Sequence, residues 1–129
     1  MSLGIDLVPY KNCTYDCVYC ECGPTTVRTL SRQAFFPFGE VREDLRRVLS
    51  SRPQLDSVTL AGSGEPTLSL SLGDTIRCVK NEFPEYVMSV LTNGSLLSRP
   101  DVQDELIPAD RVIPTLTSAF EATFQQISR

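Results

Sequence analysis

The chain has 129 residues, which is the size of one ordinary domain with a hydrophobic core. Its 12 basic and 16 acidic residues give a net charge of −4, so binding to a nucleic-acid backbone is not supported. It contains no histidine, which excludes Ser-His-Asp and Cys-His catalytic sites and any metal site built on histidine.

Short apolar runs and amphipathic segments alternate along the chain. The runs predict four strands, at residues 5–8, 57–61, 86–91 and 111–116. The amphipathic segments predict helices at residues 40–51 and 72–83, then a short helix capped by Ser98 with Pro100 in its first turn. A last helix carries Phe120, Phe124 and Ile127 on one face.

This alternation of strand and helix predicts an α/β fold with a parallel sheet and right-handed crossovers. Each helix has one apolar stripe, which suits a single helical layer outside a curved sheet. We therefore expect a (βα)4 portion of a partial TIM-type barrel, with a doubly wound open sheet as the alternative. In both folds the active site forms at the carboxyl ends of the strands, and every unusual motif of this chain follows a predicted strand.

Three cysteines follow the first predicted strand with the spacing C-x3-C-x2-C: Cys13, Cys17 and Cys20. One loop of this kind can supply three thiolates to a [4Fe–4S] cluster and leave the fourth iron open to a small molecule. The alternative is structural zinc, which usually takes four protein ligands, and Cys22 is the nearby fourth thiol. We interpret Cys22 as a neighbour of the site, and Cys78 as a small, partly buried residue.

The cellular setting follows from what the sequence lacks. No apolar run approaches the roughly 20 residues of a membrane span. The first residues lack the basic and apolar regions of a signal peptide. We therefore expect a cytoplasmic chain with no membrane partner, whose five cysteines are reduced thiols or metal ligands.

A flexible polar loop, Gly62-Ser63-Gly64-Glu65-Pro66, follows the second predicted strand. Glycines let a ligand approach the backbone closely, and the carbonyl groups and Glu65 can accept hydrogen bonds from an ammonium group. The alternative is a tight turn with Glu65 near a helix N-terminus, where a carboxylate is favoured. Asn93-Gly94 after the third strand is a common turn signal, and its place on the same rim is what connects it with function.

With these motifs the chain resembles the radical S-adenosylmethionine (SAM) superfamily. The resemblance rests on C-x3-C-x2-C, with Tyr19 just before its last cysteine, and on Gly64-Glu65-Pro66. Within the superfamily, residues 3–9, 60–68 and 91–95 resemble radical SAM iron–sulfur oxidoreductases related to the enzymes that build wyosine on tRNA. The acidic charge balance argues mildly against tRNA as a partner.

The resemblance implies a radical SAM enzyme of oxidoreductase or transferase type. The three cysteines would hold [4Fe–4S], and the amino and carboxylate groups of SAM would chelate the open iron. A one-electron reductant of the flavodoxin or ferredoxin type would reduce the cluster. Cleavage of SAM would then give a 5′-deoxyadenosyl radical that abstracts hydrogen from an unknown substrate.

The resemblance also implies roles for other residues. Tyr19 would offer its backbone to the adenine, and the loop of Gly62, Ser63, Gly64 and Glu65 would hold the methionine amino group. Asn93 would face SAM or the substrate. The family often has an acidic residue at the ribose, whereas this chain offers only the hydroxyls of Thr117 and Ser118.

Family members have six strands, so residues 1–129 are expected to be the N-terminal part of a radical SAM core, a single incomplete domain that ends before strands 5 and 6. This leaves open whether that part is active alone. The fourth strand would then be an open edge that is liable to self-association. Two other functions stay open: a non-enzymatic zinc- or iron–sulfur-binding module, and an electron-transfer protein with four cluster ligands and no affinity for SAM.

Overall fold

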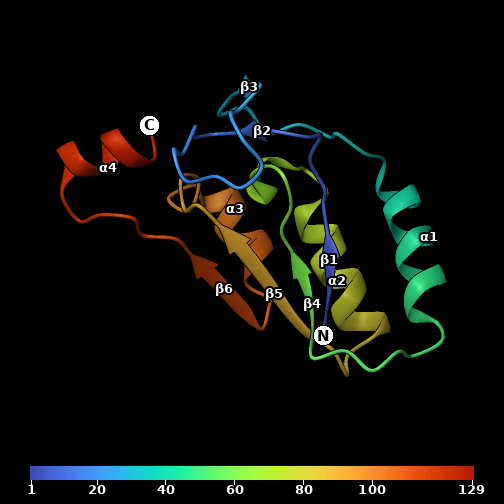
Figure 1. Cartoon of the computed structure of the whole chain (residues 1–129). Coiled ribbons are helices and arrows are strands. Elements are labelled where there is room, and N and C mark those ends of the chain that lie inside the picture. Colours follow the sequence, from blue (N-terminus) through green and yellow to red (C-terminus); the bar gives the residue numbers. More distant parts are fainter.

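A computed structural model describes all 129 residues. Its main sheet has four parallel strands in the order β1 (Ser2–Ile5), β4 (Ser57–Leu60), β5 (Val87–Thr92) and β6 (Arg111–Pro114) (Figure 1). A second, two-stranded parallel ladder joins β2 (Asn12–Cys13) to β3 (Val27–Arg28). The parallel α/β fold predicted from the sequence is confirmed, and all four main strands end at the same edge.

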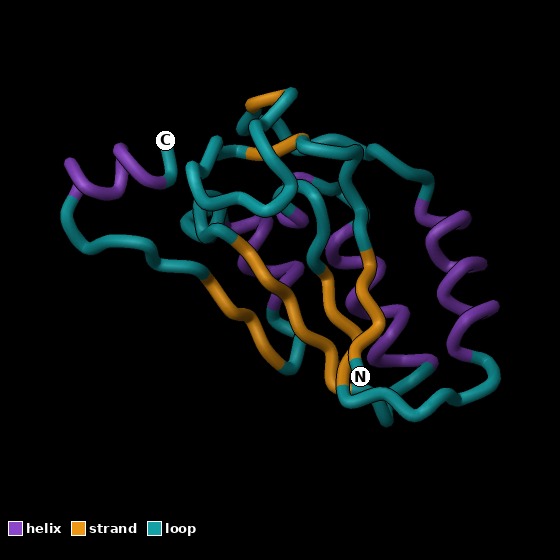
Figure 2. The backbone as a smooth tube through the Cα atoms, in the orientation of Figure 1, coloured by secondary structure: helices purple, strands orange, loops and turns teal.

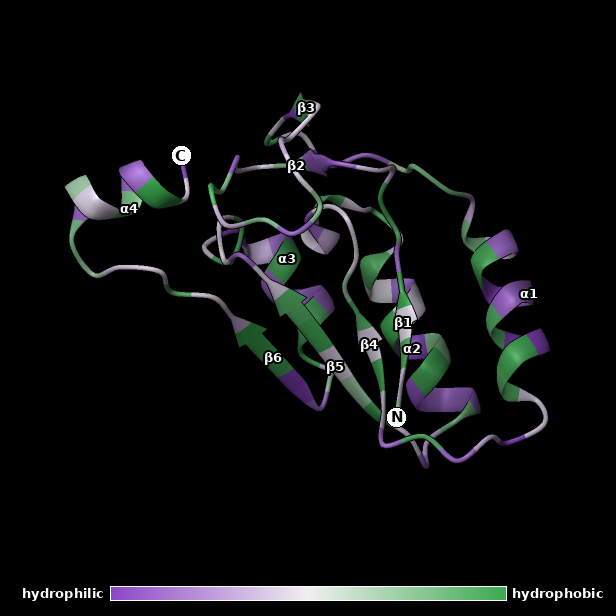
Figure 3. Ribbon diagram, viewed as in Figure 1, coloured by the Kyte–Doolittle hydropathy of each residue, from purple (hydrophilic) through white to green (hydrophobic).

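Three helices cover one face of the sheet: α1 (Phe38–Leu49), α2 (Leu72–Glu82) and α3 (Pro100–Leu106) (Figure 2). Each helix buries apolar side chains against the sheet, and the core cluster of the chain contains 18 buried residues. Figure 3 shows the resulting contrast between green, apolar stretches of the strands and helices and purple, hydrophilic helix surfaces. None of the helices is both long and apolar enough to cross a membrane.

The opposite face of the sheet carries mostly small side chains and remains open. The residues that line this hollow are Ser2, Gly4, Ser57, Thr59, Ala61, Ser89, Leu91, Arg111 and Ile113. Such a one-sided arrangement, with helices outside and a small-residue face inside, is that of a barrel segment. It favours the partial barrel over the doubly wound sheet, in which helices cover both faces.

The first strand lies three residues earlier than the sequence predicted. The strand spans Ser2–Ile5, whereas Leu7 and Val8 are buried beyond its end at the top of the core. The cause is Asp6, whose carboxylate accepts a hydrogen bond from the Val8 N–H at 3.2 Å and turns the chain. Leu7 and Val8 therefore belong to the core and Ile5 packs against it, but only Ile5 belongs to the ladder.

The last helix, α4 (Glu121–Ile127), also differs from the prediction. It buries no residue and lies beside the cysteine loop, away from the helical layer (Figure 1). Phe120 precedes the helix and is exposed, while the Phe124 ring meets the Tyr15 ring edge-on at 5.4 Å between centroids. The predicted apolar face thus contacts the cysteine loop in place of the sheet.

The third helix begins one residue later than expected. Its N-cap is Arg99, in an extended conformation, and Pro100 is the first helical residue. Ser98 therefore does not cap it, and no side chain does. The fixed φ of Pro100 decides the start, because proline suits the first turn and disfavours helix at the residue before it.

Candidate functional site

The cysteine loop is closed at its base by backbone hydrogen bonds. The β2–β3 ladder pairs Cys13 with Arg28, and the Thr29 N–H donates to the Cys13 carbonyl at 3.0 Å. Further along, the Asp16 carboxylate accepts from the Thr25 N–H at 2.9 Å. Asp16 therefore has a structural role, because it shapes the loop that carries the thiols.

All three motif cysteines are free and partly exposed, and each sulfur has a polar partner. The Lys11 ammonium donates to Cys20 Sγ at 3.0 Å, and the Asn93 side-chain amide donates to Cys13 Sγ at 3.6 Å. The Cys17 thiol donates to the Ser128 carbonyl at 3.8 Å. These contacts point the thiols of the loop toward polar groups rather than into the core.

The structure gathers no three cysteine, aspartate or glutamate side chains in metal-binding geometry. The donor set nevertheless fits an iron–sulfur cluster better than zinc. Three free thiols share one short loop, and N–H groups donate to two of the sulfurs, as is common around cluster ligands. Structural zinc would need a fourth ligand. Cys22 lies in a turn, and its carbonyl accepts a hydrogen bond from the Tyr10 hydroxyl at 2.7 Å.

Gly64 brings the second rim loop against the cysteine loop. A Cβ at Gly64 would lie 2.1 Å from the carbonyl oxygen of Asn12, and the Glu65 N–H donates to this same oxygen at 3.1 Å. Glycine is thus required here because one backbone approaches another. The cysteine loop and the Gly-Glu-Pro loop are therefore in direct backbone contact.

Gly62 has a similar explanation on the other side of the loop. Its φ of 156° is accompanied by close contact with Asp6, whose carboxyl carbon would be 2.2 Å from an added Cβ. The Asp6 carboxylate accepts hydrogen bonds from the Ser63 N–H at 3.1 Å and the Ser63 hydroxyl at 3.2 Å. The loop after β4 is therefore fixed by the turn after β1.

The Glu65 carboxylate is buried and surrounded by donors. Oε1 accepts from the Thr67 N–H at 3.2 Å, the Thr67 hydroxyl at 2.6 Å and the Thr92 hydroxyl at 2.5 Å. Oε2 accepts from the Asn93 N–H at 2.8 Å. Glu65 thereby caps the 3₁₀ turn η1 (Pro66–Leu68), as the alternative reading of the sequence held, and ties it to the end of β5.

Asn93 and its neighbours complete the ring of contacts. The Asn93 side-chain amide donates to the Thr14 hydroxyl at 2.8 Å, and Thr14 also pairs with the Ser95 hydroxyl at 2.7 Å. Thr14 is 3% exposed and lies between two motif cysteines, Cys13 and Cys17, along the chain. The loops that follow β1, β4 and β5 thus form one hydrogen-bonded unit at the rim of the sheet.

Thr117 and Ser118, which follow β6, make no hydrogen bond to the loops of this unit. The Thr117 hydroxyl pairs with that of Ser128 at 2.8 Å, and Ser118 accepts from the Phe120 N–H at 3.0 Å. Both hydroxyls therefore serve the connection to α4. Tyr19 is about half exposed in the turn before the last motif cysteine.

Lys11 dominates the electrostatics of the loop. Burial opposes its charge, but the hydrogen bond with Cys20 and the attraction of nearby thiolates raise the pKa of Lys11 above its ordinary value. In return, the Lys11 hydrogen bond lowers the pKa of the Cys20 thiol. Burial raises the pKa of Cys13, which lies deeper in the loop.

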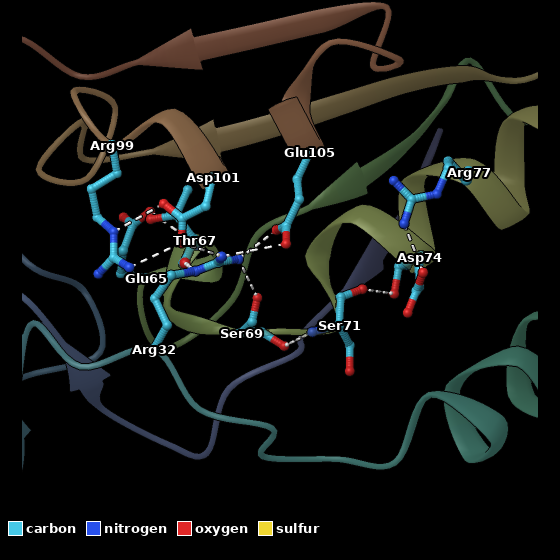
Figure 4. A network of polar contacts seen from close by, with 11 residues as sticks. Arg32, Glu65, Thr67, Ser69, Ser71, Asp74, Arg77, Arg99, Asp101 and Glu105 are labelled. Carbon is cyan, nitrogen blue, oxygen red and sulfur yellow. Dashed lines mark hydrogen bonds and ion pairs between the residues drawn. The ribbon is translucent and has the colours of Figure 1, made fainter. Parts of the chain in front are cut away.

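Arg32 links the η1 turn to helix α3. Its side chain is 3% exposed and lies between the acidic side chains of α3 and the backbone at η1 (Figure 4). It donates to Glu105 at 2.5 Å and Asp101 at 3.2 Å, and to the carbonyls of Thr67 at 2.7 Å and Ser69 at 2.8 Å. The turn that Glu65 caps is thus held from a second side.

Several of these residues were not predicted from the sequence. Lys11, Asp6 and Arg32 lie outside the predicted motifs, and Thr14 is an unspecified position within the cysteine motif. Lys11 had one available signal, since it is one of only two lysines in the chain and lies two residues before the first cysteine. Arg32 lies in a segment whose sequence shows no clear periodicity.

Comparison with known proteins identifies the family. The profile described as the radical SAM superfamily matches residues 7–129. The chain belongs to this superfamily. The superfamily that the sequence resembles is thus confirmed.

Curated relatives match nearly the whole chain. It is 36% identical over 128 residues to a GTPase Obg of Brachyspira hyodysenteriae, covering 99% of this chain and 19% of that protein. It is 35% identical over 130 residues to a UPF0026 protein of Synechocystis sp., covering 99% of this chain and 48% of that protein. For a UPF0026 protein of Methanocaldococcus jannaschii the values are 32% over 132 residues, 99% and 40%. The chain spans less than half the length of these relatives.

Proposed function

We propose that the chain binds a [4Fe–4S] cluster through Cys13, Cys17 and Cys20 and binds SAM at the open iron. One observation carries this proposal: the cysteine loop, the Gly-Glu-Pro loop and the Thr-Asn-Gly loop form one hydrogen-bonded unit. The unit would place three thiolates beside the loop that receives an ammonium group. When bound, the cluster would supply the electron that cleaves SAM to a 5′-deoxyadenosyl radical.

Within this proposal the rim loops divide the work. The backbone of Gly62, Ser63 and Gly64 offers carbonyl acceptors for the methionine amino group. The Glu65 carboxylate already accepts four protein hydrogen bonds, so it serves the amino group chiefly by fixing that backbone and by its negative charge. Asn93 orients Cys13, while Tyr19 offers its backbone to the adenine.

The reaction class that we propose follows from the family. We propose hydrogen abstraction from a substrate, with electrons from a flavodoxin- or ferredoxin-type donor and Thr117 or Ser118 near the ribose. We also propose that the chain is the N-terminal part of a core related to the wyosine-synthesising branch. The residues that resemble this branch are 3–9, 60–68 and 91–95. Residues 1–129 would then need strands beside β6 for turnover.

Cysteine variants test the cluster. The chain is reconstituted with iron and sulfide without oxygen, and iron, sulfide and zinc are counted in Cys17→Ser and Cys22→Ser. The proposal expects about four irons per chain in the wild type, loss of most iron in Cys17→Ser, and near-normal iron in Cys22→Ser. One zinc without iron, lost equally in both variants, would favour the non-enzymatic zinc module instead.

A further inference from the structure

Lys11 is a buried cation next to the cysteine loop. The residue is 2% exposed, and its backbone has a left-handed φ of 57° that turns the side chain under the loop. Its carbonyl accepts from the Thr26 and Val27 N–H groups at 3.1 and 3.3 Å, which fixes this conformation. A non-glycine residue in such a conformation is uncommon and is maintained here by its surroundings.

Lys11 has no carboxylate partner. None of the ion pairs in the structure includes it, whereas the only other lysine, Lys80, pairs with Asp110 at 2.8 Å on the surface. A buried ammonium group without a counter-charge is costly. The polar side-chain atom that Lys11 does reach is Cys20 Sγ, at 3.0 Å. The negative charge that balances Lys11 is therefore expected at Cys20 Sγ or at a group bound to it.

We propose that Lys11 is a positioning residue that makes the cluster easier to reduce, through its charged N–H···S bond to Cys20. This inference rests on the proposed function. A cubic cluster with three thiolates is net negative and gains one more negative charge on reduction. A fixed cation bonded to one of its sulfurs stabilises the reduced form more than the oxidised form.

The second N–H···S contact of the loop provides a comparison within the site. Asn93 donates to Cys13 from a neutral amide and at the longer distance of 3.6 Å, and it also bonds to Thr14. Its effect on the charge balance is therefore smaller. A purely packing role for Lys11 would be preserved by methionine, which has a similar length and no charge.

The test measures the reduction potential of the cluster in the reconstituted 129-residue chain. The potential is obtained from a redox titration that is monitored by electron paramagnetic resonance. Lys11→Met is expected to shift the potential to more negative values. Lys11→Arg, which keeps the charge, is expected to stay close to wild type. Lys80→Met is the matched control, because it removes the other lysine, and its potential is expected to equal that of wild type.

A second measurement does not depend on the Lys11→Met variant and serves if that variant fails to fold or to hold iron. Because the chain has two lysines, ¹⁵N-lysine labelling of Lys80→Arg leaves Lys11 as the only labelled residue. Pulsed electron paramagnetic resonance of the reduced cluster is then expected to detect nitrogen coupling from Lys11. Absence of this coupling, or equal potentials in Lys11→Met and Lys80→Met, would overturn the role of Lys11 and leave the proposed function standing. Absence of iron from the wild type would overturn both.

Discussion

Gly64 and Asn12 are in backbone contact: an added Cβ at Gly64 would lie 2.1 Å from the Asn12 carbonyl oxygen, and that oxygen accepts from the Glu65 N–H at 3.1 Å. The residue before the first motif cysteine is thus packed on the Gly-Glu-Pro loop. Two motifs that are about 50 residues apart meet without an intervening side chain. The geometry of one loop therefore depends on the other.

Gly64→Ala is expected to separate the two loops. The clash is with backbone, which cannot rotate away. We therefore expect the free energy of unfolding to fall by about 1–3 kcal/mol. We also expect reduced iron binding. Gly39→Ala is the control, because nothing lies within 4 Å of an added Cβ in that helix. Urea denaturation of both variants checks this. Equal stability of Gly64→Ala and wild type would contradict it.

Glu65→Gln is expected to destabilise the rim. The carboxylate accepts from Thr67, Thr92 and Asn93, and an amide nitrogen would face one of these donors without accepting from it. The expected cost is about 1–3 kcal/mol. The exposed Glu43→Gln on α1 is the matched control, expected within about 0.5 kcal/mol of wild type. Thermal unfolding that moves equally in the two variants would count against this role of Glu65.

Arg32→Met is expected to loosen the link between η1 and α3. It leaves the carbonyls of Thr67 and Ser69 and the carboxylate of Glu105 without their donor, at a cost of about 3 kcal/mol. Arg77→Met removes an exposed pair with Asp74 and should cost less than about 1 kcal/mol. Chemical denaturation ranks the two variants, and a reversed order would refute the prediction.

Cys78 is expected to make stability depend on alkaline pH. Burial and the hydrogen bond to Glu82 raise the pKa of this thiol from 9.0 to about 11. The unfolded chain loses this proton first, so the contribution is complete below pH 9.0 and is lost as pH rises through about 11. In the metal-free, reduced chain, the free energy of unfolding should fall more steeply with pH for wild type than for Cys78→Ala over this interval. Parallel pH profiles would disprove it.

The sequence was sufficient for the order of the four main strands and four helices and for the motifs, whereas the short β2–β3 ladder was not predicted. Periodicity identified the helices at α1 and α2 to within two residues, and the strand ends placed the cysteines, Gly-Glu-Pro and Asn93 at one edge. The contacts that link these motifs are backbone hydrogen bonds and hydrogen bonds of polar side chains around the motifs. The hydrogen bond from the Glu65 N–H to the Asn12 carbonyl and the position of Lys11 depend on how two loops fold over each other, which no local pattern encodes.

The misplaced elements have the same origin. Three of the residues 5–8 are apolar, which predicts a strand, yet Asp6 ends the ladder by accepting hydrogen bonds from the Val8 and Ser63 N–H groups. The stripe of α4 was read as facing the sheet, yet Phe124 meets Tyr15. In both cases the hydrophobic pattern was recognised, and its tertiary partner was not.

The most direct test of the central claim is the electron paramagnetic resonance spectrum of the reduced, reconstituted chain with and without SAM. Binding of SAM at an open iron predicts a cluster signal from about four irons whose shape changes on addition of SAM, with loss of that signal in Cys17→Ser. A cluster spectrum that stays identical when SAM is added, in a chain that takes up no SAM by calorimetry, would contradict the account.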